Sequence, residues 1–514
     1  IPAIRPAVIY NHLSNRIYRG VRYLRVQSMK WPAAGALLVL AGMTGCGSQY
    51  RPVINPITQT GPPSQPGAFV AVFSQPGLVA GSADSTTPPC PSSAYTSPGV
   101  VTVLDASGDS VAAQATLGNG PLTFALDPAG ATAYSENCDG TLSSMVINGS
   151  LQSKDVATST LLPGSAPINA LVLTTGQYIV EQGHNAIAAL GGSPPTLKVE
   201  ITNIAPSVIN LTGISQAQRI YSISQGNSLS SAGALAWGAC GSPSAVSVNG
   251  EADGIEIASN SVSSRIPLGV CPVYGITSQD GRRAFILNRG SGTITVINSQ
   301  TNQLDTVNAS AYLNGTGTIN LCNGATPCNA GPVYADFYTP GNLLVVSNYD
   351  NDTVSVIDTS LDIYGNDSST FGKVVATIPV GHEPAAVSVL QDGSRAYVAN
   401  ELDGTVTVVS LTSFTPLSTI QLPPVPAPTP TDPNNTVTAQ PRSIVSNYNY
   451  PAGNVFVAAQ NSPYVTVIRT DTDVISAQIL VQGNVVDLHT SSQYAAQASV
   501  NNNIQSRSVG SGAP

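Results

Sequence analysis

Short runs that alternate apolar and polar residues, rich in Val, Ile, Ala and Tyr, recur along most of the chain. The clearest copy is residues 373–410, KVVATIPVGHEPAAVSVLQDGSRAYVANELDGTVTVVS, in which Gly, Pro and Asp separate four such runs. Alternating β-branched residues between turn-forming residues are typical of β-strands, and the Asp-Gly pairs at 392–393 and 403–404 suit tight hairpin turns. The pattern therefore predicts a small four-stranded antiparallel sheet.

This unit is repeated. Counterparts of its second run, RAYVAN, are expected to start near residues 69, 132, 177, 244, 284, 343, 395 and 455. One such sheet buries too little apolar surface to be stable alone, so the copies are expected to stack. Residues 485–489 resemble the first strand of a unit, which the first copy lacks. We therefore expect the C-terminal strand to pair with the N-terminal unit and close a ring.

The number of units is eight by this count. The number is seven if the poorly matching region 196–242 does not form an independent boundary between units.

The segments YVAN at residues 397–400, followed by DGTVTVVS, and SNYDNDTVSVIDTS at residues 347–360 resemble the repeat of the YVTN β-propeller family. The resemblance extends over about residues 68–490 and is strongest at residues 332–422. It implies an all-β propeller of four-stranded antiparallel blades in a secreted or surface-displayed protein. It implies no single catalytic activity, because function resides in sites rather than in folds.

The N-terminal region has the pattern of an export signal. An apolar run of ten residues, 33–42, is too short to span a bilayer but suits the core of a signal peptide. It leads into MTGC, which resembles the bacterial lipobox and ends at Cys46, the residue that would carry the lipid. An ordinary secretory signal with a coincidental Cys is the alternative.

Four segments are expected on this basis. They are a leader and lipoprotein signal peptide at 1–45, a Pro-rich tether at 46–67, the propeller at 68–490 and a disordered tail at 491–514. The expected location is the bacterial cell envelope, with the exported chain held at the membrane by its lipid anchor.

Charge narrows the range of partners. Removing residues 1–45 takes away six Lys or Arg and no acids, which changes the formal net charge from −9 to −15. An acidic chain lacks the basic face that nucleic acid requires. We expect a monomer without nucleic acid or cofactor, and a protein or glycan of the envelope as partner.

Six Cys follow Cys46, and an exported chain is expected to pair them as three disulfides. Cys322 and Cys328 enclose a small loop. Cys90 and Cys138 fall on the same rim of neighbouring units, and Cys240 and Cys271 are left by exclusion. Only the first pair is well founded, since six Cys allow fifteen pairings.

Few side chains occur in a pattern that indicates a binding or catalytic site. Asn or Gln is expected to end the second strand in seven units, where it either lines a binding surface or sets the local turn. The residues are Asn137, Gln182, Asn249, Asn288, Asn348, Asn400 and Gln460.

His184 and His382, with Glu181 and Glu383 beside them, are the candidates for the axial face. They lack the local spacing of a metal site, so no metal or catalytic set is assigned. A binding or scaffolding module is the preferred function; the alternative is a lactonase-like or other hydrolytic propeller enzyme with an axial active site.

Overall fold

The described part of the chain lies within one compact unit, Ser64–Pro514. The computed structural model describes residues 69–77, 97–106, 110–213, 218–226, 248–306, 312–313, 315–322, 328–338, 342–390, 392–427, 435–446, 453–460 and 462–491. The predicted leader, Cys46, the tether and nearly all of the predicted tail fall outside these residues. No helix among them is long and apolar enough to cross a membrane.

The first four blades follow one another along the chain. Blade 1 consists of β1 (Phe69–Gln75), β2 (Val100–Asp105), β3 (Ser110–Thr116) and β35 (Asn484–Ser491). Blade 2 consists of β4 (Pro121–Leu126), β5 (Thr132–Asn137), β6 (Thr141–Val146) and β7 (Ala157–Thr160). Blade 3 consists of β8 (Pro167–Leu173), β9 (Gly176–Glu181), β10 (Ala186–Gly191) and β11 (Thr196–Ile201). Blade 4 consists of β12 (Val208–Gly213), β13 (Arg219–Ser224), β14 (Asn249–Glu256) and β15 (Ser261–Val270).

The other four blades complete the set. Blade 5 consists of β16 (Pro272–Thr277), β17 (Arg283–Asn288), β18 (Thr293–Asn298) and β19 (Gln303–Leu304), with β20 (Thr318–Asn320) also on β18. Blade 6 consists of β21 (Pro332–Tyr338), β22 (Leu343–Asn348), β23 (Thr353–Asp358) and β24 (Val374–Pro379). Blade 7 consists of β25 (Pro384–Val389), β26 (Arg395–Asn400), β27 (Thr405–Ser410) and β28 (Thr415–Gln421). Blade 8 consists of β31 (Pro441–Ser446), β32 (Asn454–Ala459), β33 (Tyr464–Arg469) and β34 (Val474–Leu480).

Short elements also lie outside the blades in the described part of the chain. A two-stranded ribbon pairs β29 (Val425–Pro426) with β30 (Thr436–Val437), and 3₁₀ turns occur at Ser153–Asp155 and Tyr349–Asn351.

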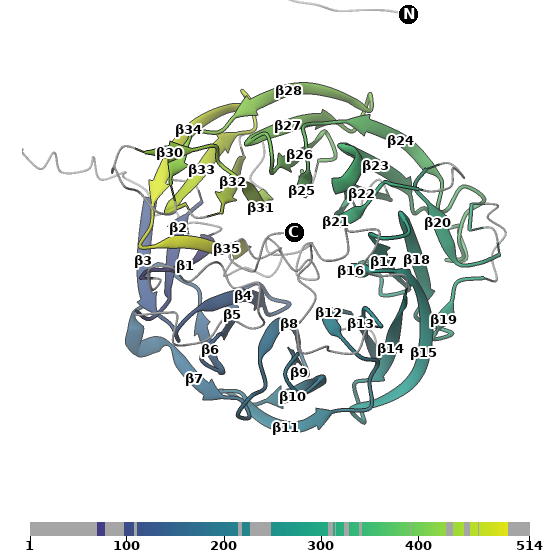
Figure 1. The fold of residues 1–514 in the computed structure, drawn as a ribbon, viewed down its shortest axis with the longest axis horizontal. Coiled ribbons are helices and arrows are strands. Elements are labelled where there is room, and N and C mark those ends of the chain that lie inside the picture. The colour runs from purple at the N-terminus through teal and green to yellow at the C-terminus, as the bar shows by residue number, and fades with distance from the viewer. Residues whose placement is uncertain are drawn as a thin grey trace, which may run out of the picture. The chain divides into compact units, whose positions relative to one another are not determined.

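The blades are arranged in a ring (Figure 1). The inner strand is β35 in blade 1 and the first strand along the chain in the other blades, and the outer strand is β3 in blade 1 and the fourth strand in the others. Every residue of the inner strand β25 is buried, whereas the outer strand β28 buries one residue of seven. Inner strands have neighbours on both faces and so need continuous apolar runs, while outer strands contact the core through single positions. The predicted eight-bladed, all-β propeller is confirmed.

The ring closes as predicted from residues 485–489. Strand β35 pairs antiparallel with β1, placing Val72 opposite Leu488, and both side chains are fully buried. The imidazole of His489 packs against Phe124 of blade 2 in a T-shaped arrangement, with ring centroids 4.8 Å apart. Closure gives blade 1 its fourth strand, so β1 is paired on both sides.

One face of the ring, here called the upper face, carries the turns between second and third strands and the links from each fourth strand to the next blade. A repeated backbone hydrogen bond ties these two sets of loops together. Glu401 N–H donates to the carbonyl of Glu383 at 2.9 Å, and Gln225 N–H donates to that of Ser207 at 3.0 Å. The upper face therefore has a similar framework in different blades.

The position of this hydrogen bond in blade 4 shows that the predicted second strand of that blade is wrong. In blade 4 the second strand is β13, which ends at Ser224, and not a strand starting near residue 244. Asn249 begins the third strand, so it does not belong to the predicted set of amides. The sequence AVSVN-GEADG imitates a second strand and its turn, but residues 225–248 are inserted between the two strands, and this insertion shifted the assignment.

The predicted turns and the best-founded disulfide are confirmed. Gly393 and Gly404 both have φ of 66°, the left-handed conformation that an Asp-Gly hairpin turn needs. Cys322 is bonded to Cys328. Cys138 and Cys271 are also disulfide-bonded, but Cys90 and Cys240 lie outside the described residues, so those two pairings stay predictions.

Candidate binding sites on the upper face

The four candidate residues lie on the upper face but in two separate places. Glu181 ends β9 and His184 lies in the turn that follows it, both in blade 3. His382 and Glu383 lie in the link between β24 and β25, from blade 6 to blade 7. The sequence candidates therefore do not form one site; each pair has its own surroundings.

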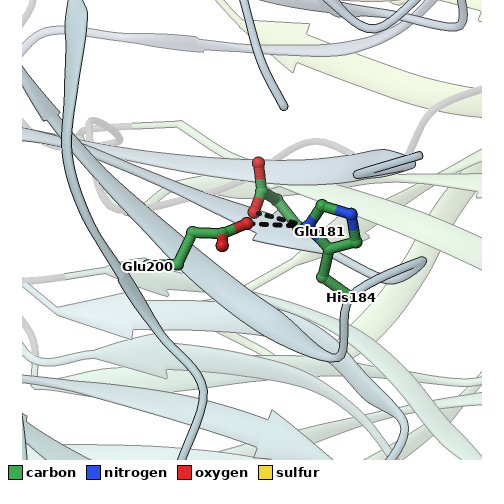
Figure 2. A group of neighbouring side chains, drawn as sticks. All are labelled: Glu181, His184 and Glu200. Carbon is green, nitrogen blue, oxygen red and sulfur yellow. Dashed lines mark hydrogen bonds and ion pairs between the residues drawn. The ribbon is translucent and has the colours of Figure 1, made fainter. Parts of the chain in front are cut away.

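The first cluster joins Glu181 and His184 to Glu200 of the outer strand β11 (Figure 2). His184 Nδ1 lies 2.7 Å from Glu200 Oε1 and 3.8 Å from Glu181 Oε2. On its other side, the ring presents Nε2 to the carbonyl oxygen of Pro163 at 3.1 Å. The Glu181 side chain is fully buried, whereas those of His184 and Glu200 are 28% and 22% exposed.

Burial and mutual proximity set the protonation of this cluster. Burial, followed by the neighbouring Glu200 carboxyl, raises the pKa of Glu181 to about 8. The hydrogen bond with Glu200 raises the pKa of His184. Burial works against ionisation of Glu200, but its hydrogen bonds with Glu181 and His184 lower its pKa. At neutral pH the protein alone thus holds a proton between the two carboxyl groups, beside the His184 ring.

Sequence reasoning missed Glu200. It lies 16 residues beyond His184 in a strand of mixed charge, TLKVEI, which is the ordinary composition of a solvent-facing outer strand. Only the pairing of β10 with β11 brings it over the turn that holds His184.

The second site is a pocket of about 600 Å³ on the upper face that receives residues from blades 5 to 8. Its lining is mostly polar and includes two arginines and four acids: Arg289, Arg442, Asp350, Asp352, Glu383 and Glu401. Most of these residues come from the turns after β17, β22 and β26, so one pocket combines corresponding turns of successive blades.

One wall of the pocket is fixed by Arg289. Its guanidinium binds Asp350 through two hydrogen bonds, Nη2 to Oδ1 at 2.7 Å and Nε to Oδ2 at 3.1 Å. The same group lies 4.8 Å from the ring centroid of Tyr349. The Tyr349 hydroxyl in turn donates to Glu383 at 2.9 Å. This chain of contacts holds three blades in one arrangement.

A second, deeper wall is built on Arg442. Its side chain is 1% exposed, and Nε and Nη2 both donate to Glu401 Oε1, at 2.8 and 2.5 Å. Nη1 is buried without a hydrogen-bond partner among the described residues. The pair therefore joins β31 of blade 8 to the turn after β26 of blade 7.

His382 lies at the rim of the pocket with its side chain 63% exposed. Its Nδ1 is 2.9 Å from Asp403 Oδ1, its backbone N–H donates to Asp403 Oδ2 at 2.7 Å, and its Nε2 is 3.8 Å from Asp352. Asp403, followed by Asp352, raises the pKa of His382. The imidazole is oriented by one carboxylate and presents its other nitrogen to the pocket.

Four of the amides at the ends of the second strands have a structural role. Asn400 Nδ2 donates to the hydroxyls of Thr405 and Thr407 at 2.9 and 2.8 Å. Three further amides make the same pair of contacts with hydroxyls of the next strand: Asn137, Asn288 and Asn348. Each amide is saturated locally on its donor side, so these four hold the turn rather than form a binding ring.

No protein-family model and no curated protein matches the chain, so the resemblance to the YVTN family stays a prediction. Among solved structures, apo AztD from Citrobacter koseri is similar, with 13% sequence identity, coverage of 82% of this chain and 98% of that one, and a TM-score of 0.51. The dihydro-heme d1 dehydrogenase NirN in complex with DHE has 12% identity, coverage of 83% and 77%, and a TM-score of 0.49. At this identity the likeness to AztD supports the propeller fold alone.

Proposed function

We propose that this chain is an exported, lipid-anchored β-propeller that binds a glycan of the cell envelope in the pocket over blades 5 to 8. The observation that carries the proposal is the composition of that pocket. Carboxylates, guanidinium groups and the amides of Gln440 and Gln460 surround about 600 Å³, with Leu402 and Tyr349 as its larger apolar side chains.

This lining suits a ligand rich in hydroxyl groups. A sugar hydroxyl both donates to carboxylates such as Asp352 and accepts from guanidinium or amide groups, so it can satisfy either kind of wall. Small-molecule pockets for apolar ligands are lined mainly by hydrophobic and aromatic side chains. Tyr349 adds one aromatic ring beside the polar groups, and its hydroxyl is already fixed by Glu383.

The direct test is binding of the purified chain to glycans released from the envelope, measured on a glycan array and by calorimetry. Glu383→Gln keeps an acceptor for the Tyr349 hydroxyl but removes the charge. Asp352→Asn removes the charge of the carboxylate that lies 3.8 Å from His382 Nε2. Both are expected to weaken binding at least tenfold. The control is Asp471→Asn. This exposed carboxylate pairs with Arg469 and accepts a hydrogen bond from Thr472, in the connection that follows β33. Equal affinity in all three variants, or no glycan bound, would contradict the proposal.

Anchoring is tested separately. Changing Cys46 to Ser is expected to move the protein from the membrane to the soluble fraction without changing its affinity for the ligand. Unchanged membrane association would refute lipidation at Cys46 and leave the pocket proposal standing.

The alternative, a hydrolytic enzyme, has one observation in its favour. His382 is oriented by Asp403 and presents Nε2 to the pocket, which is how a general base is held for activating water. Turnover of lactones or esters that is lost in both His382→Gln and Asp403→Asn would favour the enzyme. Turnover that survives both changes would exclude this pair as its catalytic base.

A further inference from the structure

The cluster of Glu181, His184 and Glu200 lies in blade 3, apart from the pocket over blades 5 to 8. We propose that these three side chains bind one divalent transition-metal ion, with one imidazole nitrogen and two carboxylates as ligands. One ligand atom from each residue lies within 4.8 Å of the others, a spacing at which a single ion can contact all three.

The orientation of His184 is the first argument. Its Nε2 faces the carbonyl oxygen of Pro163 at 3.1 Å, and a carbonyl oxygen can only accept. Nε2 therefore carries a hydrogen, so the proton that a metal ion would displace from the ring is the one on Nδ1, the atom that faces both glutamates. A backbone carbonyl that fixes the tautomer in this way is the usual outer partner of a metal-bound histidine.

The burial of Glu181 is the second argument. Its side chain is fully buried, and neither of its oxygens accepts a hydrogen bond from an N–H or hydroxyl group among the described residues, so in the metal-free protein only the proton shared with Glu200 compensates it. A buried carboxylate without donors is costly, because water no longer solvates it. The groups that it faces are His184 Nδ1 and the Glu200 carboxyl, so a cation between them satisfies all three lone pairs together.

The ligand types and exposure indicate the class of ion. Imidazole suits first-row transition metals and zinc, whereas calcium takes six to eight oxygen ligands. His184 and Glu200 are partly exposed, so an ion can enter from solvent and keep water in its remaining positions. We therefore expect Zn²⁺ to bind more tightly than Mn²⁺, and Ca²⁺ weakly.

The test is calorimetric titration of the chelator-treated full chain with zinc chloride at pH 7.5, with cobalt(II) absorption as a second readout. The expected result is one Zn²⁺ bound at the cluster. His184→Ala is expected to weaken this binding by more than the roughly 10–100-fold that loss of an outer partner causes. Glu200→Gln retains the shape of the side chain and is also expected to lose the site.

A matched control separates this site from the other histidine on the upper face. His382→Ala removes an imidazole that also lies beside two carboxylates, Asp352 and Asp403, and is expected to bind Zn²⁺ as the wild type does. Melting temperatures in chelator report whether each variant folds. If His184→Ala does not fold, Glu200→Gln tests the site in its place.

Two results would overturn the proposal. One is the absence of a stoichiometric Zn²⁺ site in the wild type, which would mean that a proton alone bridges the cluster. The other is a site that persists in both His184→Ala and Glu200→Gln. A wild-type chain that binds Zn²⁺ but no glycan would refute the function proposed above and leave this inference intact.

Discussion

Replacing Arg442 with Met is predicted to destabilise the propeller strongly. The guanidinium is 1% exposed and its partner Glu401 has a 4% exposed side chain, so neither charge is solvated. Removing Arg442 leaves the Glu401 carboxylate buried without its cation. Breaking a buried pair in this way costs about 3–5 kcal/mol, more than a hundredfold in the unfolding constant.

The assay is urea unfolding followed by far-UV circular dichroism, with stability compared at unchanged m-value. Combining Arg442→Met with Glu401→Gln removes both charges, so the double variant is expected to lose less stability than the sum of the two single variants. The control is Arg469→Met, which breaks a pair with Asp471 that is half exposed on its arginine side and is expected to cost less than about 1 kcal/mol.

The reasoning would be refuted if Arg442→Met cost no more than Arg469→Met. It would also fail if the effects of the Arg442 and Glu401 substitutions simply added. Either result would mean that the contact between blades 7 and 8 does not depend on this charge pair.

Two further predictions concern buried polar groups. Burial raises the pKa of Asp336 from 3.8 to about 7, so the folded state binds this proton more tightly than the unfolded state does. The stabilisation of the fold that results is fully present below the unfolded pKa and is lost as pH rises through 7. The wild type is therefore expected to lose up to about 4 kcal/mol of unfolding free energy between pH 4 and 8. Asp336→Asn keeps an acceptor for Val389 N–H and is expected to abolish this pH dependence, measured by urea unfolding across that range. Asn400→Ala is expected to cost about 1–3 kcal/mol, because the hydroxyls of Thr405 and Thr407 lose a buried partner; an unchanged melting temperature would show that the amide is dispensable.

The repeat pattern was sufficient to predict the fold because it carried two independent signals. Period-two alternation identified strands, and recurrent turns such as Asp403-Gly404 fixed their order within a blade. The unmatched strand at 485–489 then predicted closure. In blade 4 a long insertion separates the second strand from the third. A strand pattern alone does not show its position within the blade, so the prediction placed Asn249 on the wrong strand.

The candidate sites were less accessible to sequence reasoning. His184 and His382 were singled out because histidine is rare in this chain, and both lie beside carboxylates in the structure. Their partners were not predicted: Glu200 comes from an outer strand, and Arg442 from the first residues of blade 8. Contacts of this kind depend on how blades and strands are juxtaposed, and no local spacing encodes them.

Hydrogen exchange on the C-terminal strand tests the closed ring most directly, and both proposed sites depend on that ring as their scaffold. If β35 completes blade 1, the ladder amides within Asn484–Ser491 should exchange as slowly as those of Pro441–Ser446, the inner strand of blade 8. Exchange at the rate of an unstructured peptide in Asn484–Ser491, with β31 protected, would contradict the account.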